Sequence, residues 1–294
     1  MRPIDAALTV GIMMVWGLNF VVAKLSLAEM PAIFTMSLRF MLVAILLLPF
    51  VKMPSRQDMK AIALLGFTLG GLHFSSMFTG MKNLDAGLAA IATQSQVPFA
   101  ALLSAVILKD YPGWRRWTGM GLAFFGIWLA TGGAVSGGAP FYVGLVLFAS
   151  FMWAVANFQF KSLTHIDGFT LNAYTALWTV PFQLVFSAML ETGQIDAFLN
   201  ASWRAYAGVV FMSVVITICT YWLWYRLLRR YSVNVTIPYT LLVPVFGVMF
   251  GVIFNGDALG WRMIAGTAAT ILGVGIIVLR RPADVGGEST SKMS

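Results

Sequence analysis

Apolar runs of about 20 residues, separated by short polar stretches, follow one another along almost the whole chain. A helix of that length spans the ~30 Å hydrocarbon core of a bilayer, and in lipid each helix satisfies its own backbone polar groups. The pattern therefore predicts an all-α polytopic membrane protein with ten transmembrane helices. The expected spans are 5–24, 32–51, 61–80, 85–108, 116–134, 140–161, 169–190, 205–226, 232–254 and 262–280.

The fourth and ninth spans each interrupt their apolar run with polar residues and a proline near mid-depth. Gln94 precedes Pro98 by one turn, and Tyr239 and Thr240 precede Pro244. Proline removes a backbone hydrogen bond and bends a helix. We expect the two prolines to be hinges between mobile half-helices or, alternatively, static kinks that shape a cavity.

Composition agrees with the membrane interpretation and narrows the partners. Hydrophobic residues make up 59% of the chain and charged residues 10%, against about 25% charged in a soluble protein. The net charge of +8 is explained better by basic loops than by nucleic acid, so no nucleic-acid partner is expected. The single cysteine, Cys219, lies in an apolar span, which excludes disulfides and cysteine metal clusters. We expect no metal and no cofactor.

The distribution of Lys and Arg predicts the orientation. The N-terminus, alternate loops and the C-terminus carry Arg2, Lys52, Arg56, Lys60, Lys109, Arg115, Arg116, Lys161, Arg226, Arg229, Arg230, Arg280, Arg281 and Lys292. The opposite loops carry only Lys24, Lys82, Arg204 and Arg262. This bias predicts that both termini are cytoplasmic. The first apolar run lacks a small-residue cleavage site and is expected to be a retained span, and residues 282–294 are expected to form a disordered tail.

The two halves of the chain repeat one another. Residues 97–130 align with 243–276, so that Pro98 matches Pro244 and Gly119 matches Gly266. The predicted repeats are 1–135 and 136–281, with five spans each. An odd number of spans makes the second copy enter the membrane from the opposite side. Such an inverted repeat is typical of secondary transporters with a site near the midplane, and it favours a self-contained monomer.

Several local patterns carry a resemblance to a known family. They are Trp16-Gly17-Leu18-Asn19-Phe20 in the first span, Leu38-Arg39-Phe40 in the second, and a fourth span with a mid-span proline, a basic loop and a Gly-rich fifth span. Over about residues 5–281 the chain resembles the EamA type of the drug/metabolite transporter superfamily. The resemblance implies a bacterial inner-membrane carrier, often an exporter of amino acids or other small metabolites, and no enzyme. It also implies that the first, third, fourth, sixth, eighth and ninth helices surround a central cavity.

Polar and aromatic residues on those helices are the candidates for binding a small-molecule substrate. The expected cavity residues are Trp16, Asn19, His73, Gln94, Trp153, Asn157, Tyr221, Tyr239 and Thr240. For Asn19 and Asn157 the alternative is a bond between helices, and for His73 it is a bond to a neighbouring helix. Tyr221 could be interfacial instead, because its span ends near Arg226. Gln94 and Gln96 lie about 200° apart on an ideal helix, so only Gln94 is expected to face the cavity.

Charged residues inside spans are few. All eleven acidic residues fall in loops, in the tail or in the last turn of a span. Coupling to protons generally needs a carboxylate within the membrane, so we expect none here. Arg39 is the one charge well inside a span. We expect it to pair with an acidic residue such as Glu29 or Asp85; the alternative is capture of a substrate carboxylate on the outer side.

These features predict an exporter of amino acids, with apolar or aromatic side chains favoured, that works by alternating access. A carrier of nucleosides, sugars or drugs is the alternative. A membrane enzyme is remote, because it would need clustered His, Asp, Glu or Cys at mid-depth. A channel would usually show a selectivity filter or a ring built by oligomer symmetry.

Overall fold

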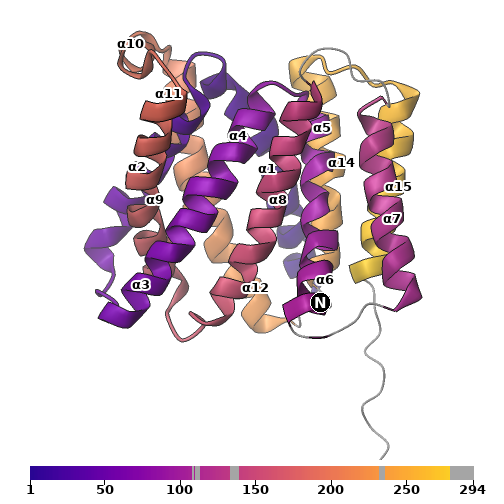
Figure 1. The fold of residues 1–294 in the computed structure, drawn as a ribbon, viewed down its shortest axis with the longest axis horizontal. Coiled ribbons are helices and arrows are strands. Elements are labelled where there is room, and N and C mark those ends of the chain that lie inside the picture. Colours follow the sequence, from indigo (N-terminus) through magenta and orange to yellow (C-terminus); the bar gives the residue numbers. More distant parts are fainter. Residues whose placement is uncertain (108, 110–112, 133–138, 232–235, 279–294) are drawn as a thin grey trace, which may run out of the picture.

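Helices account for all the regular structure that the computed structural model describes, which is the chain without residues 108, 110–112, 133–138, 232–235 and 279–294 (Figure 1). The first half contains α1 (Pro3–Leu27), α2 (Ala32–Leu47), η1 (Leu48–Phe50), α3 (Arg56–Leu65), η2 (Gly66–Phe74), α4 (Ser75–Lys82), α5 (Ala86–Ala92), η3 (Thr93–Ser95), α6 (Gln96–Ile107) and α7 (Trp114–Ala130). The second half contains α8 (Ala139–Lys161), α9 (Gly168–Leu190), α10 (Gln194–Asn200), α11 (Trp203–Val210), η4 (Phe211–Thr220), α12 (Tyr221–Arg230), η5 (Ile237–Leu241), α14 (Leu242–Phe250), η6 (Gly251–Asn255) and α15 (Trp261–Val278).

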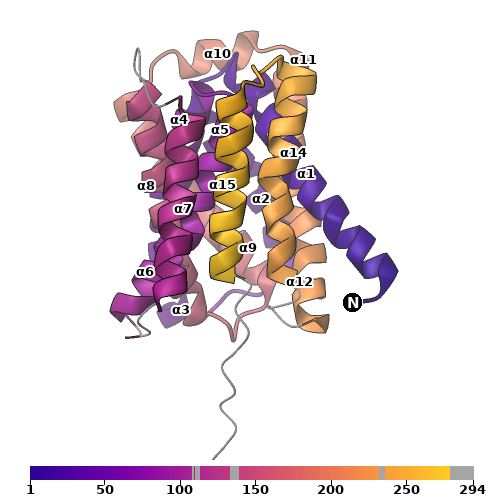
Figure 2. The same ribbon diagram turned by 90° about the vertical axis from the view of Figure 1, so that its right-hand side faces the viewer.

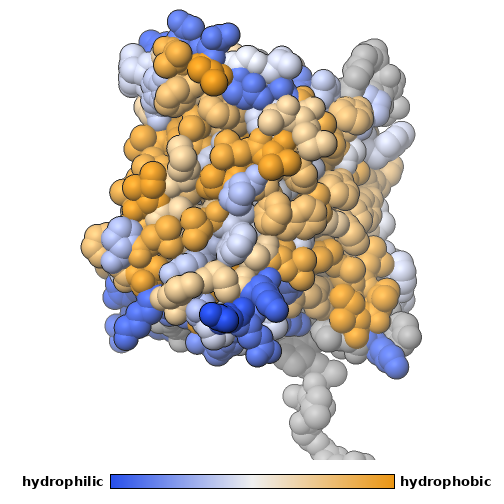
Figure 3. Space-filling model, turned by 60° about the vertical axis from the view of Figure 1, so that its left-hand side comes forward, coloured by the Kyte–Doolittle hydropathy of each residue, from blue (hydrophilic) through white to orange (hydrophobic). Residues whose placement is uncertain are grey.

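Nine continuous helical segments in the described part of the chain are long and apolar enough to cross a membrane. The remaining predicted span, 116–134, overlaps α7, which is 17 residues long and lies beside α15 in both ribbon views (Figures 1 and 2). In Figure 3 hydrophobic residues cover the middle of the molecule and hydrophilic residues gather at its two ends. This surface suits a multi-pass membrane protein whose sides contact lipid.

Short polar side chains cap the first turn of α9 and of α3. The carboxylate of Asp167 accepts hydrogen bonds of 3.0 Å from the N–H groups of Phe169 and Thr170, which have no partner within α9. Ser55 begins α3 in the same way by accepting from the N–H of Asp58. These two caps satisfy backbone N–H groups where the chain enters α9 and α3 from short polar connections.

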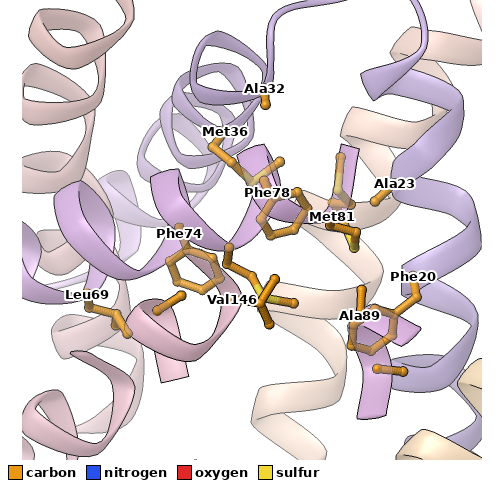
Figure 4. Close-up of a cluster of buried hydrophobic side chains, with 14 of the residues drawn as sticks. Phe20, Ala23, Ala32, Met36, Leu69, Phe74, Phe78, Met81, Ala89 and Val146 are labelled. Carbon is orange, nitrogen blue, oxygen red and sulfur yellow. The ribbon is translucent and has the colours of Figure 1, made fainter. Parts of the chain in front are cut away.

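The spans of the two halves pack against one another in matched pairs. Helix α2 of the first half packs on α9 of the second, and α7 packs on α15 in the same way. Helix α1 lies against α14, and α6 lies against α8. Buried side chains fill the space between these pairs, with Phe20, Met36, Phe74, Phe78 and Met81 in one cluster (Figure 4). The N-terminus and the end of α15 lie at the same end of the molecule (Figure 2). The predicted cytoplasmic location of that end stays a prediction.

Glycines allow α7 and α15 to approach backbone to backbone. A Cβ added at Gly119 would lie 2.8 Å from the carbonyl oxygen of Gly273, and a Cβ added at Gly266 would lie 2.5 Å from the carbonyl oxygen of Gly126. The contacts are reciprocal: the early glycine of each helix meets the late glycine of the other. Small residues at helix interfaces allow close van der Waals packing, which is a main source of helix association in lipid.

Gly126→Ala is expected to lower the melting temperature of the purified protein in detergent. The new Cβ would lie 2.4 Å from Thr270 Oγ1 and 2.5 Å from its backbone nitrogen, and overpacking of this kind costs about 1–3 kcal/mol. The matched control is Gly121→Ala on the exposed side of α7, where a Cβ meets nothing within 4 Å. The control should melt at the same temperature or slightly higher, because alanine favours the helix. Equal melting temperatures for the two variants would contradict the proposed close packing.

Candidate functional site

A cavity of about 740 Å³ lies between the two halves of the chain. Its walls come from α1, α2, η2, α4, η3 and α6 in the first half, and from α8, α9, η4, α12, η5 and α14 in the second. Leu163, Thr164 and Ile166, in the connection between α8 and α9, also line it, so the cavity extends toward the end of the molecule that holds the N-terminus. The volume is within the usual range for small-molecule sites.

Two breaks in the helical backbone face this cavity at equivalent places. The short 3-10 segment η3 comes directly before α6, and η5 comes directly before α14. Pro98 lies two residues into α6, and Pro244 lies two residues into α14. Because proline has no N–H, the carbonyl one turn earlier loses its α-helical partner, and tighter 3-10 bonding uses the carbonyls there. A hinge role for the prolines stays a prediction.

A second matched pair of breaks widens the helical turns of η2 and η4. The backbone of η2 and that of η4 have π-helical turns, in the third and eighth predicted spans. The hydroxyl of Thr217 donates to the carbonyl of Met212, five residues earlier, at 2.9 Å. Single π turns are frequent at functional sites because they rotate the following side chains relative to the helix.

Trp16 begins an aromatic wall shared between α1 and α12. Its Nε1–H donates to the hydroxyl of Thr220 at 2.7 Å. Its ring centre lies 5.8 Å from that of Tyr221, edge to face, and 5.5 Å from that of Trp224. All three rings line the cavity. The hydrogen bond satisfies the indole, so that Trp16 presents an apolar face to a ligand.

His73 of η2 and Trp153 of α8 form a second aromatic wall, which is again shared between the two halves. Their ring centres are 5.0 Å apart, and both residues line the cavity. The Nδ1 atom of His73 lies 2.7 Å from the carbonyl oxygen of Ala149. A carbonyl oxygen only accepts, so Nδ1 carries a proton and the neutral ring has its lone pair on Nε2. His73 therefore combines both expected roles: it bonds a neighbouring helix and lines the cavity.

The predicted amides and the threonine are also brought to the cavity. Asn19, Gln94, Asn157 and Thr240 all line it. The Oδ1 atom of Asn19 is buried and has no hydrogen-bond partner among the described residues. A buried amide oxygen without a partner is costly unless water or a ligand bonds to it. The contact of these residues with substrate stays a prediction.

Two expectations about the fourth and ninth spans were wrong. Tyr239 is half-buried and packs against the hydrophobic core, and it is not among the lining residues. Gln96, which was expected to face away, lines the cavity beside Gln94. The angle of about 100° per residue applies to a continuous α-helix. The 3-10 turn Thr93–Ser95 interrupts that geometry and changes the direction of the residues that follow.

Arg39 lines the cavity without the acidic partner that was expected. The side chain is 2% exposed, and no carboxylate of a described residue lies within ion-pair distance of it. Glu29 instead accepts hydrogen bonds from the backbone and hydroxyl of Ser202, at 2.5 and 2.6 Å. Asp85 is exposed at the start of α5. Arg39 donates to the hydroxyl of Thr217 from two nitrogens, at 3.1 and 2.8 Å.

The seventh predicted span contributes polar lining residues that sequence reasoning missed. Asn172 and Thr175 of α9 line the cavity. The amide of Asn172 donates to the carbonyl of Thr217, and Thr175 Oγ1 is buried without a partner among the described residues. The two polar residues are three positions apart and thus share one helix face. That spacing within an apolar span was a signal that could have identified them.

Comparison with known proteins agrees with this architecture. The EamA-like transporter family matches twice, over residues 4–132 and 140–279. A protein of Salmonella typhimurium named "Probable amino-acid metabolite efflux pump" is 30% identical over 96% of this chain and 99% of its own length. An Escherichia coli protein of the same name is 29% identical over 93% and 94%. One solved crystal structure has a TM-score of 0.63 at 14% identity, covering 95% of this chain and 98% of the other.

Thiol labelling should detect which side of the membrane the cavity faces. In a Cys219→Ser background, which has no other cysteine, Asn157→Cys places a thiol on the exposed cavity wall. A membrane-impermeant reagent should label it in inside-out vesicles, where the connection between α8 and α9 is expected to face the reagent. Ala156→Cys is the control, because Ala156 is 0% exposed. Equal labelling of both variants would contradict the lining of the cavity.

Proposed function

Because the chain belongs to the EamA-like transporter family, we propose that it is a secondary transporter that exports amino acids, with apolar or aromatic side chains favoured. The composition of the cavity wall carries this proposal. Trp16, Trp153 and Trp224 supply aromatic surface, and a few amides supply hydrogen bonds. Sites for small molecules are mostly apolar with a few polar groups that set orientation and specificity. The names of the two relatives described above support a metabolite exporter.

The proposed architecture is ten transmembrane helices in two inverted repeats, 1–135 and 136–281. The family matches once in each half, and the reciprocal glycine contacts between α7 and α15 are those expected of a twofold axis between equivalent helices. In this arrangement α7 is the fifth span, and α15 is the tenth. Each repeat then crosses the membrane five times, which gives the two copies opposite directions.

Transport is proposed to occur by alternating access, with the described conformation open toward the cytoplasm. The cavity extends to the end that holds the N-terminus. Toward the other end α5 and α14 close on each other: a Cβ at Gly247 would lie 2.5 Å from that of Ala90, and Asp257 accepts from the N–H of Gly87 at 3.1 Å. Separation of these helices, with closure at the opposite end, would expose the same site to the outside.

A protonatable carboxylate is not part of the proposed mechanism. None of the described lining residues is Asp or Glu. Asp5 is buried near the start of α1, but it accepts a hydrogen bond from Tyr231 and pairs with Arg230 at 3.4 Å, away from the lining. Movement down the substrate's own gradient is therefore favoured over exchange with protons.

Purified protein in liposomes should transport labelled amino acids that have apolar or aromatic side chains. A panel that also contains nucleosides, sugars and lipophilic cations tests the alternative substrates in the same assay. Imposing a pH gradient should leave the initial rate unchanged. Transport of another class with no amino acid transported would overturn the proposal. Acceleration by the gradient would overturn only the uncoupled mechanism.

Asn19→Ala is expected to reduce transport about two- to tenfold, because one hydrogen bond to a polar substrate group is worth roughly 0.5–1.5 kcal/mol. Its level in the membrane should not change, since the Oδ1 atom has no partner among the described residues. Asn83→Ala is the control: Asn83 lies outside the cavity lining, and its amide bonds only the carbonyl of Thr79. If the two variants transport equally well, Asn19 is not part of the binding site.

A further inference from the structure

We propose that Arg39 binds a carboxylate of the substrate, and that the cavity selects small organic carboxylates, including amino acids held by their α-carboxylate, over the matching amides and amines. This inference deepens the proposed function and rests on it for the location of the site. It starts from the charge of the cavity wall. Arg39 is the sole charged side chain among the described residues that line the cavity.

The charge of Arg39 is not neutralised by the protein around it. Two carboxylates that bond to the ends of neighbouring helices have other partners: Glu191 accepts from the N–H groups of Ile33 and Phe34, at 2.8 and 3.0 Å, and Glu29 accepts from Ser202. No described carboxylate forms an ion pair with Arg39. A cavity that holds one buried cation attracts an anion, because a charge in a poorly solvated site is weakly screened.

The hydrogen bonds of Arg39 within the described residues also leave part of its N–H donors without an oxygen acceptor. An arginine has five N–H donors in a planar fork. Among the described residues, Thr217 Oγ1 takes the bonds from Nε and one terminal nitrogen, and the other terminal nitrogen has only Met36 Sδ, at 3.9 Å. Thioether sulfur is a weak acceptor. The fork geometry suits the two oxygens of a carboxylate, which would bond to donors that the protein leaves without an oxygen partner.

Aromatic rings surround the guanidinium and complete the proposed subsite. Its central carbon lies 5.3 Å from the ring centre of Phe40, 5.1 Å from that of Phe74 and 5.8 Å from that of Phe78. These rings hold the cation and also line the cavity. Phe74 in turn contacts His73, with ring centres 4.6 Å apart. A substrate whose carboxylate bonds to Arg39 would therefore place its side chain among apolar rings.

A purely structural role for Arg39 is the competing explanation. Arg39 does join α2 to η4, since the hydroxyl of Ser213 also donates to its backbone carbonyl at 3.1 Å. Such a tether would affect stability and overall rate. It would not affect which ligand chemistry is preferred. Discrimination between a carboxylate and an uncharged isostere is therefore the decisive measurement.

The wild-type protein in liposomes provides the first test. Export of a labelled aromatic amino acid is competed with 3-phenylpropanoate, 3-phenylpropanamide and phenylethylamine, which share one ring and differ in the polar group. The carboxylate should compete at least about tenfold better than the amide or the amine, because it alone offers two charged oxygens to the guanidinium fork. Equal competition by acid and amide would overturn the role of Arg39 and leave the proposed function standing.

Variants then assign the preference to this residue. Arg39→Gln should abolish the acid-over-amide preference, and Arg39→Lys, which keeps the charge but lacks the fork, should retain part of it. Arg204→Gln is the matched control, since Arg204 is exposed, lies over the Trp203 ring and is not in the lining. An unchanged preference in both Arg39 variants would overturn the assignment. If the variants fail to fold, the wild-type competition still decides.

Ligand-induced stabilisation separates this inference from the proposed function. The melting temperature of the detergent-solubilised protein is measured with 3-phenylpropanoate and with 3-phenylpropanamide, without any transport. Stabilisation by the acid alone supports carboxylate binding even if no amino acid is transported in liposomes. Stabilisation by neither compound, or by both equally, counts against carboxylate binding, whatever the outcome of the transport assay.

Discussion

The requirement that backbone polar groups be satisfied within the membrane controls where this chain departs from regular helix. Lipid offers no hydrogen bonds, so irregular backbone is tolerated only inside protein or beside a water-filled space. The 3-10 segments η3 and η5 and the π-helical segments η2 and η4 all contribute residues to the cavity wall, whereas η1 and η6, at the ends of their spans, contribute none. In contrast, α7 and α15 are unbroken and contribute no described residue to it. The breaks and the cavity therefore depend on each other.

The pairing of the breaks follows from the repetition of the sequence. A feature that occurs in one half recurs in the other: Pro98 with Pro244, and Trp16 with Trp153. Each tryptophan packs on a helix of the opposite half, Trp16 on α12 and Trp153 on η2. In the proposed inverted repeat each helix would meet its own copy, and the contact between α2 and α9 agrees with that arrangement.

The sequence predicted the helices and most of the cavity because both depend on strong local signals: apolar length, proline position and repeat matching. It did not predict pairings that form only in three dimensions. Thr217, which bonds Arg39, is 178 positions away and carries no local mark of that role. The direction of Gln96 was missed because it depends on a 3-10 turn that a uniform helical angle ignores. Asn172 was missed because its helix was not expected at the cavity.

The environment of Arg39 explains how a buried cation is kept available. An arginine at the centre of a transmembrane helix costs about 2.5–3.5 kcal/mol on insertion scales. A carboxylate partner would lower that cost but would occupy the guanidinium fork. Contacts with the faces of Phe40, Phe74 and Phe78 lower it by about 0.5–2 kcal/mol each and use none of the N–H donors. Aromatic rings can thus stabilise the charge while the N–H donors that do not bond to Thr217 remain open to an anion that enters the cavity.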